Sequence, residues 1–293
     1  MAVFTIAGLT LKEAVRRRTL LGAMVMGLLV LGISLILFLI YKGQQDRLAH
    51  GRILPEDYAT RMVFARSAIQ GLCLSSIKSL GAVFAALLAG GAVSGEIERG
   101  LLAVILPRPI YRWQILLGKW IGLNLILIVS TFVWTATAWL SLTLQTHRDL
   151  TPMLRAAPYL ALFPVLLSTL TLTLSAIVPR LFGTTLALTL GALAWFDGIL
   201  NTLGEFNDVP VLNKIADWVG LIVPQGYVGW WVEGTMAPIT NQGPRGSIGT
   251  SPQFLTEWGR AHLHFAHLDA VYIACYIVFV FLIGVVLFQR RDI

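Results

Sequence analysis

The sequence is poor in charged residues and in cysteine. Asp, Glu, Lys and Arg make up 13% of the 293 residues, against about 25% in typical soluble domains, while hydrophobic residues make up 56%. This composition excludes an ordinary soluble domain and predicts an integral membrane protein. The two cysteines, Cys73 and Cys275, lie in or at the edge of apolar runs, so they supply neither a disulfide framework nor a zinc site.

The sequence also lacks the motifs of an energy source or a hydrolytic site. Gly118-Lys119 is followed by Trp120, which cannot supply the magnesium-binding hydroxyl of a phosphate-binding loop. H-E-x-x-H and G-x-S-x-G are absent, and no predicted span holds a pair of carboxylates. We therefore expect no chemistry and no cofactor in this chain, with energy supplied by a partner.

The net charge of +7 is explained better by a membrane than by nucleic acid. Basic residues flank the apolar runs, where they meet anionic lipid headgroups. We expect the lipid bilayer, and no nucleic acid, as a partner.

Long apolar runs predict the fold. An α-helix of about 20 residues crosses roughly 30 Å of hydrocarbon. The short alternating segments of a membrane β-barrel are missing, so the prediction is an all-α, single-domain integral membrane protein covering residues 1–293. The predicted spans are residues 20–41, 68–93, 113–144, 158–178, 181–203 and 267–288.

Six spans place both termini on one side of the membrane. Lys and Arg divide equally between the two sides, but those on the side of the termini lie closer to span ends, which favours that side as cytoplasmic. Residues 1–18 predict an amphipathic surface helix, because Phe4, Ala7 and Leu11 share one face. A cleaved signal peptide is disfavoured, since the apolar run that follows is too long. Residues 204–266 predict an extracytoplasmic loop with interfacial helices.

Small residues recur along the second span and permit close helix packing, either within one subunit or between two. They form two ridges with a spacing of four: Gly81, Ala85 and Ala89, and Ala82, Ala86 and Gly90.

A few polar side chains within or near spans are candidates for function. Asp197 is the only acid in the interior of a predicted span, so it either lines a substrate path or reaches the interface. Asn124 is an isolated polar group of the third span, and Lys78 lies near one end of the second. His264 and His267 share a helix face and are weak candidates for a metal site, with interfacial anchoring as the alternative.

Residues 94–119 form the most charged segment on the side of the termini. Ile97, Leu101 and Ile105 recur at helical spacing, and Pro107 and Pro109 then end the predicted helix. A polar helix between two spans is either a contact for a partner outside the bilayer or an ordinary loop on the headgroups.

This segment resembles the signature loop of type-2 ABC transporter permeases. The matching strings are GEIERG at 95–100, LPRP at 106–109, and Arg112 with LGK at 117–119. Leu101 departs from the family pattern, which usually has Thr or Ser there. The basic amphipathic start, the six spans and the long outer loop agree with the same family.

The resemblance implies a coupling helix around residues 96–106 that docks on a separate cytoplasmic ABC ATPase. ATP and Mg would be bound by that ATPase, the N-terminal helix would be an elbow on the surface of the cell's inner (cytoplasmic) membrane, and two permease copies or paralogues would form a dimer. An extracytoplasmic accessory protein is a further possible partner. The implied coupling residues are Gly95, Glu96, Ile97, Glu98, Arg99, Leu101, Leu102, Ile105, Arg108 and Arg112.

The predicted function is therefore the permease subunit of an ATP-driven exporter. Two alternatives are a membrane scaffold that recruits a soluble partner through the same loop, and a membrane-embedded metal-dependent enzyme that uses Asp197 and the histidines.

Overall fold

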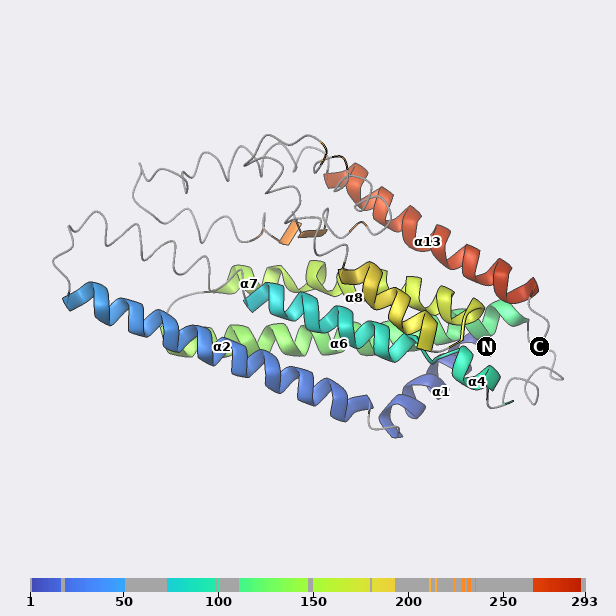
Figure 1. The fold of residues 1–293 in the computed structure, drawn as a ribbon, viewed down its shortest axis with the longest axis horizontal. Coiled ribbons are helices and arrows are strands. Elements are labelled where there is room, and N and C mark those ends of the chain that lie inside the picture. The colour runs from blue at the N-terminus through green and yellow to red at the C-terminus, as the bar shows by residue number, and fades with distance from the viewer. Residues whose placement is uncertain are drawn as a thin grey trace.

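The computed structural model describes eight stretches of the chain, one of them a single residue, and a few positions between 211 and 235. These are residues 2–16, 19–50, 73–98, 100, 111–146, 150–179, 181–192, 211–235 in part, and 266–290. Within them all regular secondary structure is helical, and Figure 1 shows long helices running side by side. The helices are α1 (Ala2–Arg16), α2 (Thr19–His50), residues 73–89, α4 (Ser94–Glu98), α6 (Arg112–Thr146), α7 (Thr151–Arg155), α8 (Ala157–Ile177), Leu181–Ala192 and α13 (Ala266–Arg290).

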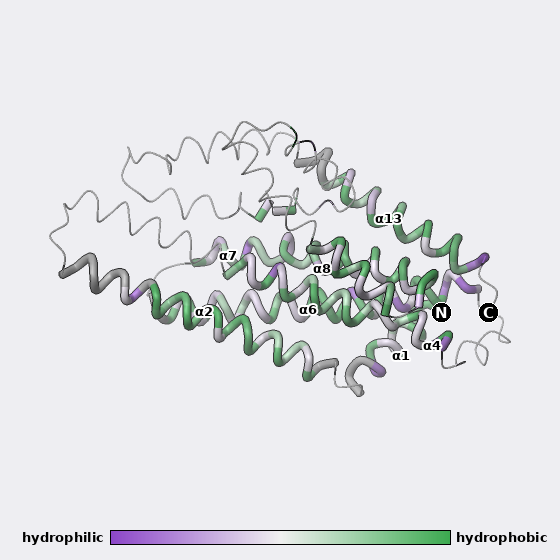
Figure 2. The backbone as a smooth tube through the Cα atoms, viewed as in Figure 1, coloured by the Kyte–Doolittle hydropathy of each residue, from purple (hydrophilic) through white to green (hydrophobic). Residues whose placement is uncertain are grey.

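Five of these helical stretches are long and apolar enough to cross a membrane. They are Leu21–Ile40, Cys73–Glu98, Arg112–Leu144, Thr151–Ile177 and Ala270–Arg290. They match the first four predicted spans and the last, and Figure 2 shows apolar residues along their length. Of the predicted fifth span only the short apolar helix Leu181–Ala192 is described, so Asp197 lies outside the described residues.

Two predicted boundaries are wrong. Helix α2 continues to His50, although the sequence predicts a loop from Lys42. The extra turns are rich in Lys, Gln, Arg, Leu and Ala, which are good helix formers even in water. Residues 151–155, which lie between the predicted third and fourth spans, form α7; Pro152 fits the first helical turn because a backbone N–H there would have no acceptor within the helix.

Helix α8 is the central helix of the bundle. In the most apolar stretch of its span, 78% of the residues are buried, against 17% in the span of α2 and 22% in the span of α13. The small-residue ridges of residues 73–89 pack inside this subunit: a Cβ on Gly81 would lie 3.7 Å from the ring of Pro164, and Ala85 is fully buried. Packing within one subunit, rather than between two, therefore accounts for these ridges.

One end of the bundle gathers the start of α1, α4, the start of α6 and the end of α13 (Figure 1). Arg112, at the start of α6, donates hydrogen bonds to the backbone oxygens of Phe288 and Gln289 in the last turn of α13, at 3.4 and 3.1 Å. A cation at the C-terminal end of a helix also stabilises the helix dipole. This contact holds the start of α6 against the end of α13, at the end of the bundle where the candidate site lies.

Candidate functional site

The helix at residues 73–89 is interrupted before α4 begins. Gly90 and Gly91 have low helix propensity, and residues 90–93 form turns and bends. Ser175 of α8 compensates for the interruption: its hydroxyl oxygen accepts hydrogen bonds from the backbone N–H groups of Val93 and Ser94, at 3.3 and 3.2 Å. The Ser94 hydroxyl in turn donates to the carbonyl of Gly90 at 3.1 Å. The central helix thus holds the bend that orients α4.

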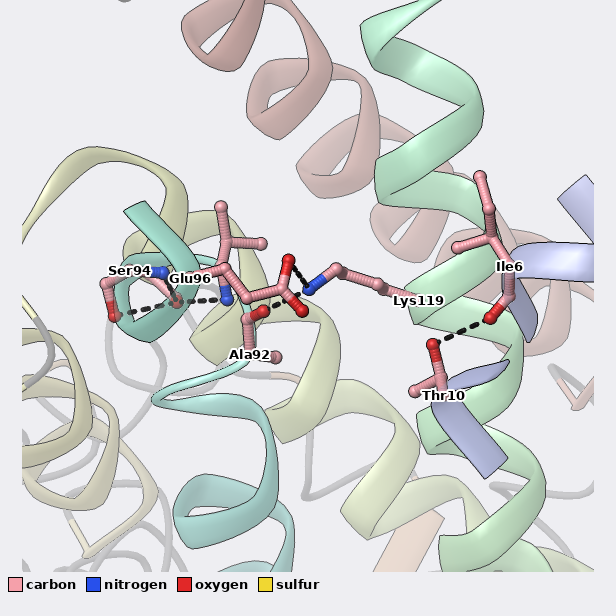
Figure 3. A network of polar contacts seen from close by, with 8 residues as sticks. Ile6, Thr10, Ala92, Ser94, Glu96 and Lys119 are labelled. Carbon is pink, nitrogen blue, oxygen red and sulfur yellow. Dashed lines mark hydrogen bonds and ion pairs between the residues drawn. The ribbon is translucent and has the colours of Figure 1, made fainter. Parts of the chain in front are cut away.

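An ion pair joins α4 to α6 directly after this bend. The Lys119 ammonium lies 2.5 Å from the Glu96 carboxylate, and the two side chains are only 8% and 17% exposed. The same ammonium donates a hydrogen bond to the carbonyl of Ala92, inside the bend (Figure 3). Because removal of one partner would leave the other charge buried and unpaired, this contact strongly constrains the position of α4 relative to α6.

Helix α1 packs on the two turns of α6 that carry Lys119. A Cβ on Gly118 would lie 2.7 Å from the Cβ of Ile6, and a Cβ on Gly122 would lie 2.9 Å from the Cβ of Thr10. Only glycine permits so close an approach, and this Gly-x-x-x-Gly spacing is typical of tight helix pairs in membranes. Figure 3 shows Ile6 and Thr10 beside the part of α6 that holds Lys119. Sequence reasoning missed this contact, although the spacing of Gly118 and Gly122 was available to indicate it.

The predicted continuous helix through Ile97, Leu101 and Ile105 is wrong. Helix α4 ends at Glu98, and Gly100 adopts a φ of 69°, a left-handed conformation that L residues rarely adopt. The Gly100 N–H donates to the carbonyl of Ile97 at 3.0 Å, as at the end of a helix. The predicted helix is therefore interrupted at Gly100, and Leu101 and Ile105 lie outside the described residues.

The described residues of the predicted coupling segment differ in their surroundings. Gly95 is buried, and Ile97 is half-buried against the apolar cluster that contains Val93. Glu96 is held by Lys119, whereas Glu98 is exposed at the end of α4. The remaining predicted coupling residues, Arg99, Leu101, Leu102, Ile105 and Arg108, lie outside the described residues.

Asn124 connects α6 to α8 and has a packing role. It is 5% exposed; its amide N–H donates to the carbonyl of Trp120 at 2.9 Å, and its side-chain oxygen accepts from the Ser168 hydroxyl at 2.6 Å. The Trp120 indole donates to the Thr169 hydroxyl at 2.8 Å. The side-chain oxygen of Asn124 therefore binds across to α8, while its amide N–H is satisfied within α6.

The histidine prediction falls mostly outside the described part of the chain. His264 is not described, and of His267 only the backbone, near the start of α13, is described. Among the side chains that the structure does describe, no three potential metal ligands come together.

The whole chain can be compared with known families. The family model of the ABC-2 family transporter protein matches residues 4–293, a range that includes most of α1, the Glu96–Lys119 pair and α13. No curated protein matches the chain. The match confirms the resemblance inferred from the 95–119 strings, and the chain belongs to the ABC-2 family of transporter proteins.

Proposed function

We propose that this chain is the membrane-spanning permease subunit of an exporter that is driven by ATP hydrolysis on a separate ABC ATPase. Family membership supports a transporter permease, and the family generally works with an ATPase subunit. ATP and Mg would bind to that partner, and a second permease copy or paralogue would complete the transport path. In this proposal the chain has six spans, α1 is a surface elbow, and the bundle end that carries α4 faces the cytoplasm of a cell whose inner membrane holds the protein.

The observation that carries this proposal is the attachment of α4 to two other helices. Lys119, in α6, pairs with the Glu96 carboxylate and donates to the Ala92 carbonyl. Ser175, in α8, accepts hydrogen bonds from the N–H groups of Val93 and Ser94. A force applied to α4 from outside the membrane would therefore move α6 and α8 instead of being absorbed by the bend. Coupling ATP hydrolysis to transport requires such a rigid connection.

The two acids of α4 have different roles in this mechanism. The resemblance alone implies that Glu96 and Glu98 both contact the ATPase. Because Glu96 is engaged by Lys119 and Glu98 is exposed, we assign Glu96 to positioning α4 and Glu98 to contact with the ATPase. The chain itself would bind no nucleotide.

The test is co-purification with the ATPase, followed by measurement of hydrolysis and transport in proteoliposomes. Glu98→Arg together with Arg99→Glu should leave the fold intact and hydrolysis measurable but should uncouple hydrolysis from transport. Lys42→Glu, which changes an exposed charge of α2, is the matched control and should transport normally. Normal transport by the Glu98/Arg99 double variant would contradict the docking role. A partner whose hydrolysis does not depend on this chain would favour the scaffold alternative.

A further inference from the structure

Helix α13 has one buried face, and that face continues into the last turn of the helix. Its buried residues recur at intervals of seven and four: Ile273, Val280, Gly284 and Phe288. Phe288 is 1% exposed, less than either Ile273 or Val280. Phe279 lies about 180° from Phe288 around the helix axis and is 64% exposed. The end of α13 is therefore anchored in the bundle by the Phe288 ring.

The Phe288 ring belongs to an apolar cluster that reaches the bend before α4. The same cluster contains Val93 of the bend and Leu116 of α6, and Ile97 of α4 packs against it. The bend is also held by polar contacts from α6 and α8. The last turn of α13 thus shares its packing with the segment that carries α4.

Two hydrogen-bonding contacts hold α13 at the same end of the bundle. Arg112 of α6 donates to the carbonyls of Phe288 and Gln289, which belong to the last turn, where helix carbonyls have no partner within the helix. From α8, the Thr173 hydroxyl donates to the carbonyl of Val280 at 3.1 Å. Helix α13 is therefore attached to both of the helices that hold α4.

We propose that Phe288 is a positioning residue that passes a movement of α4 to the last span, with Arg112 holding the backbone of the same turn. This inference rests on the proposed function, in which α4 receives force from the ATPase. A close-packed interior transmits strain because it has few voids, so a displacement of Val93 and Ile97 displaces the ring that shares their cluster. Arg112, which the resemblance assigns to coupling, contributes by binding α13.

The first experiment needs no ATPase and measures amide hydrogen exchange of residues 280–290 in the purified full-length chain. Glu96→Leu, which loosens α4, should speed this exchange about fivefold in the unmodified chain, because the two segments are coupled. In a Phe288→Ala background the same change should add less than about twofold, because the link is already broken. Phe279→Ala, which removes an exposed ring from the same helix, is the matched control and should leave the Glu96→Leu effect unchanged. Exchange of α2 reports any general loosening of the fold.

The second experiment uses the complex with the co-purified ATPase, with and without ATP and Mg. In the unmodified chain, nucleotide should change the exchange of residues 94–98 and of residues 280–290. Phe288→Ala should keep the change at 94–98 and reduce the change at 280–290 by about fivefold, whereas Phe279→Ala should keep both. Arg112→Gln, which leaves the ring in place, should reduce the change at 280–290 by about threefold even if Phe288→Ala fails to fold, and Arg112→Lys should restore part of it.

The two experiments separate this inference from the proposed function. A complex in which residues 94–98 do not respond to ATP would contradict the proposed function alone, because the first experiment tests the Phe288 link without the ATPase. The inference is overturned if Glu96→Leu speeds exchange of residues 280–290 as much in the Phe288→Ala and Arg112→Gln backgrounds as it does in the Phe279→Ala background.

Discussion

The Glu96–Lys119 pair can be tested by removing each partner and then both. Glu96→Leu leaves the ammonium of Lys119, which is 8% exposed, without its carboxylate. Breaking a buried ion pair in this way costs about 3–5 kcal/mol, and the 17% exposure of Glu96 favours the lower end of that range. Lys119→Met removes the hydrogen bond to the Ala92 carbonyl as well, so we expect it to cost at least as much.

The double variant Glu96→Leu/Lys119→Met distinguishes a paired interaction from two independent ones. Because an apolar pair of similar volume can replace a buried ion pair, we expect the double variant to lose only the hydrogen bond to the Ala92 carbonyl, about 1–3 kcal/mol, and so to be much more stable than the sum of the two single variants. The measurement is reversible unfolding in detergent, with the four proteins arranged as a double-mutant cycle. The expected interaction energy is about 3 kcal/mol or more, far above the error for independent sites.

The same four proteins test the mechanism when they are reconstituted with the ATPase. If Glu96 positions α4 and does not contact the ATPase, both single variants should lose coupling and the double variant should recover it. The reasoning is refuted if each single variant costs less than about 1 kcal/mol, or if the double variant loses as much as the two single variants together. Recovered stability without recovered coupling would instead assign the Glu96 carboxylate to contact with the ATPase.

Two further predictions concern helix contacts. Gly118→Ala places a Cβ 2.7 Å from the Cβ of Ile6 and should destabilise the fold by about 1–3 kcal/mol. The control Gly32→Ala, whose added Cβ would meet no atom within 4 Å, should be neutral or stabilising by up to about 1 kcal/mol. Equal midpoints of thermal unfolding for the two variants would contradict the close packing of α1 on α6. Ser168→Ala removes the hydroxyl that donates to Asn124 inside the bundle and should lower stability by about 1–3 kcal/mol. The control is Thr189→Ala: the Thr189 hydroxyl donates to the Thr185 carbonyl on an exposed face, so its removal should change stability by less than about 0.5 kcal/mol. A loss of similar size in both variants would argue against Asn124 as a stabilising contact between α6 and α8.

The sequence by itself determined the class of the protein, the positions of its long helices and its family. Membrane insertion depends on the length and apolar content of a local run, and both can be counted from the printed residues. Helices α6 and α13 begin and end within two residues of the predicted third and sixth spans. The 95–119 strings also indicated the family before any geometry was known, because charge, glycine and proline positions are local features.

Only the tertiary structure decided which residues meet. Glu96 and Lys119 belong to different helices, and they pair because α6 packs beside the bend at residues 90–93. Likewise, Gly118 contacts Ile6 of α1, and Lys78 lies opposite the middle of the apolar stretch Leu21–Ile40, because of how the helices pack against one another. Hydrophobic periodicity gives the faces of one helix but not its register against another, since side-chain packing over the whole bundle sets that register.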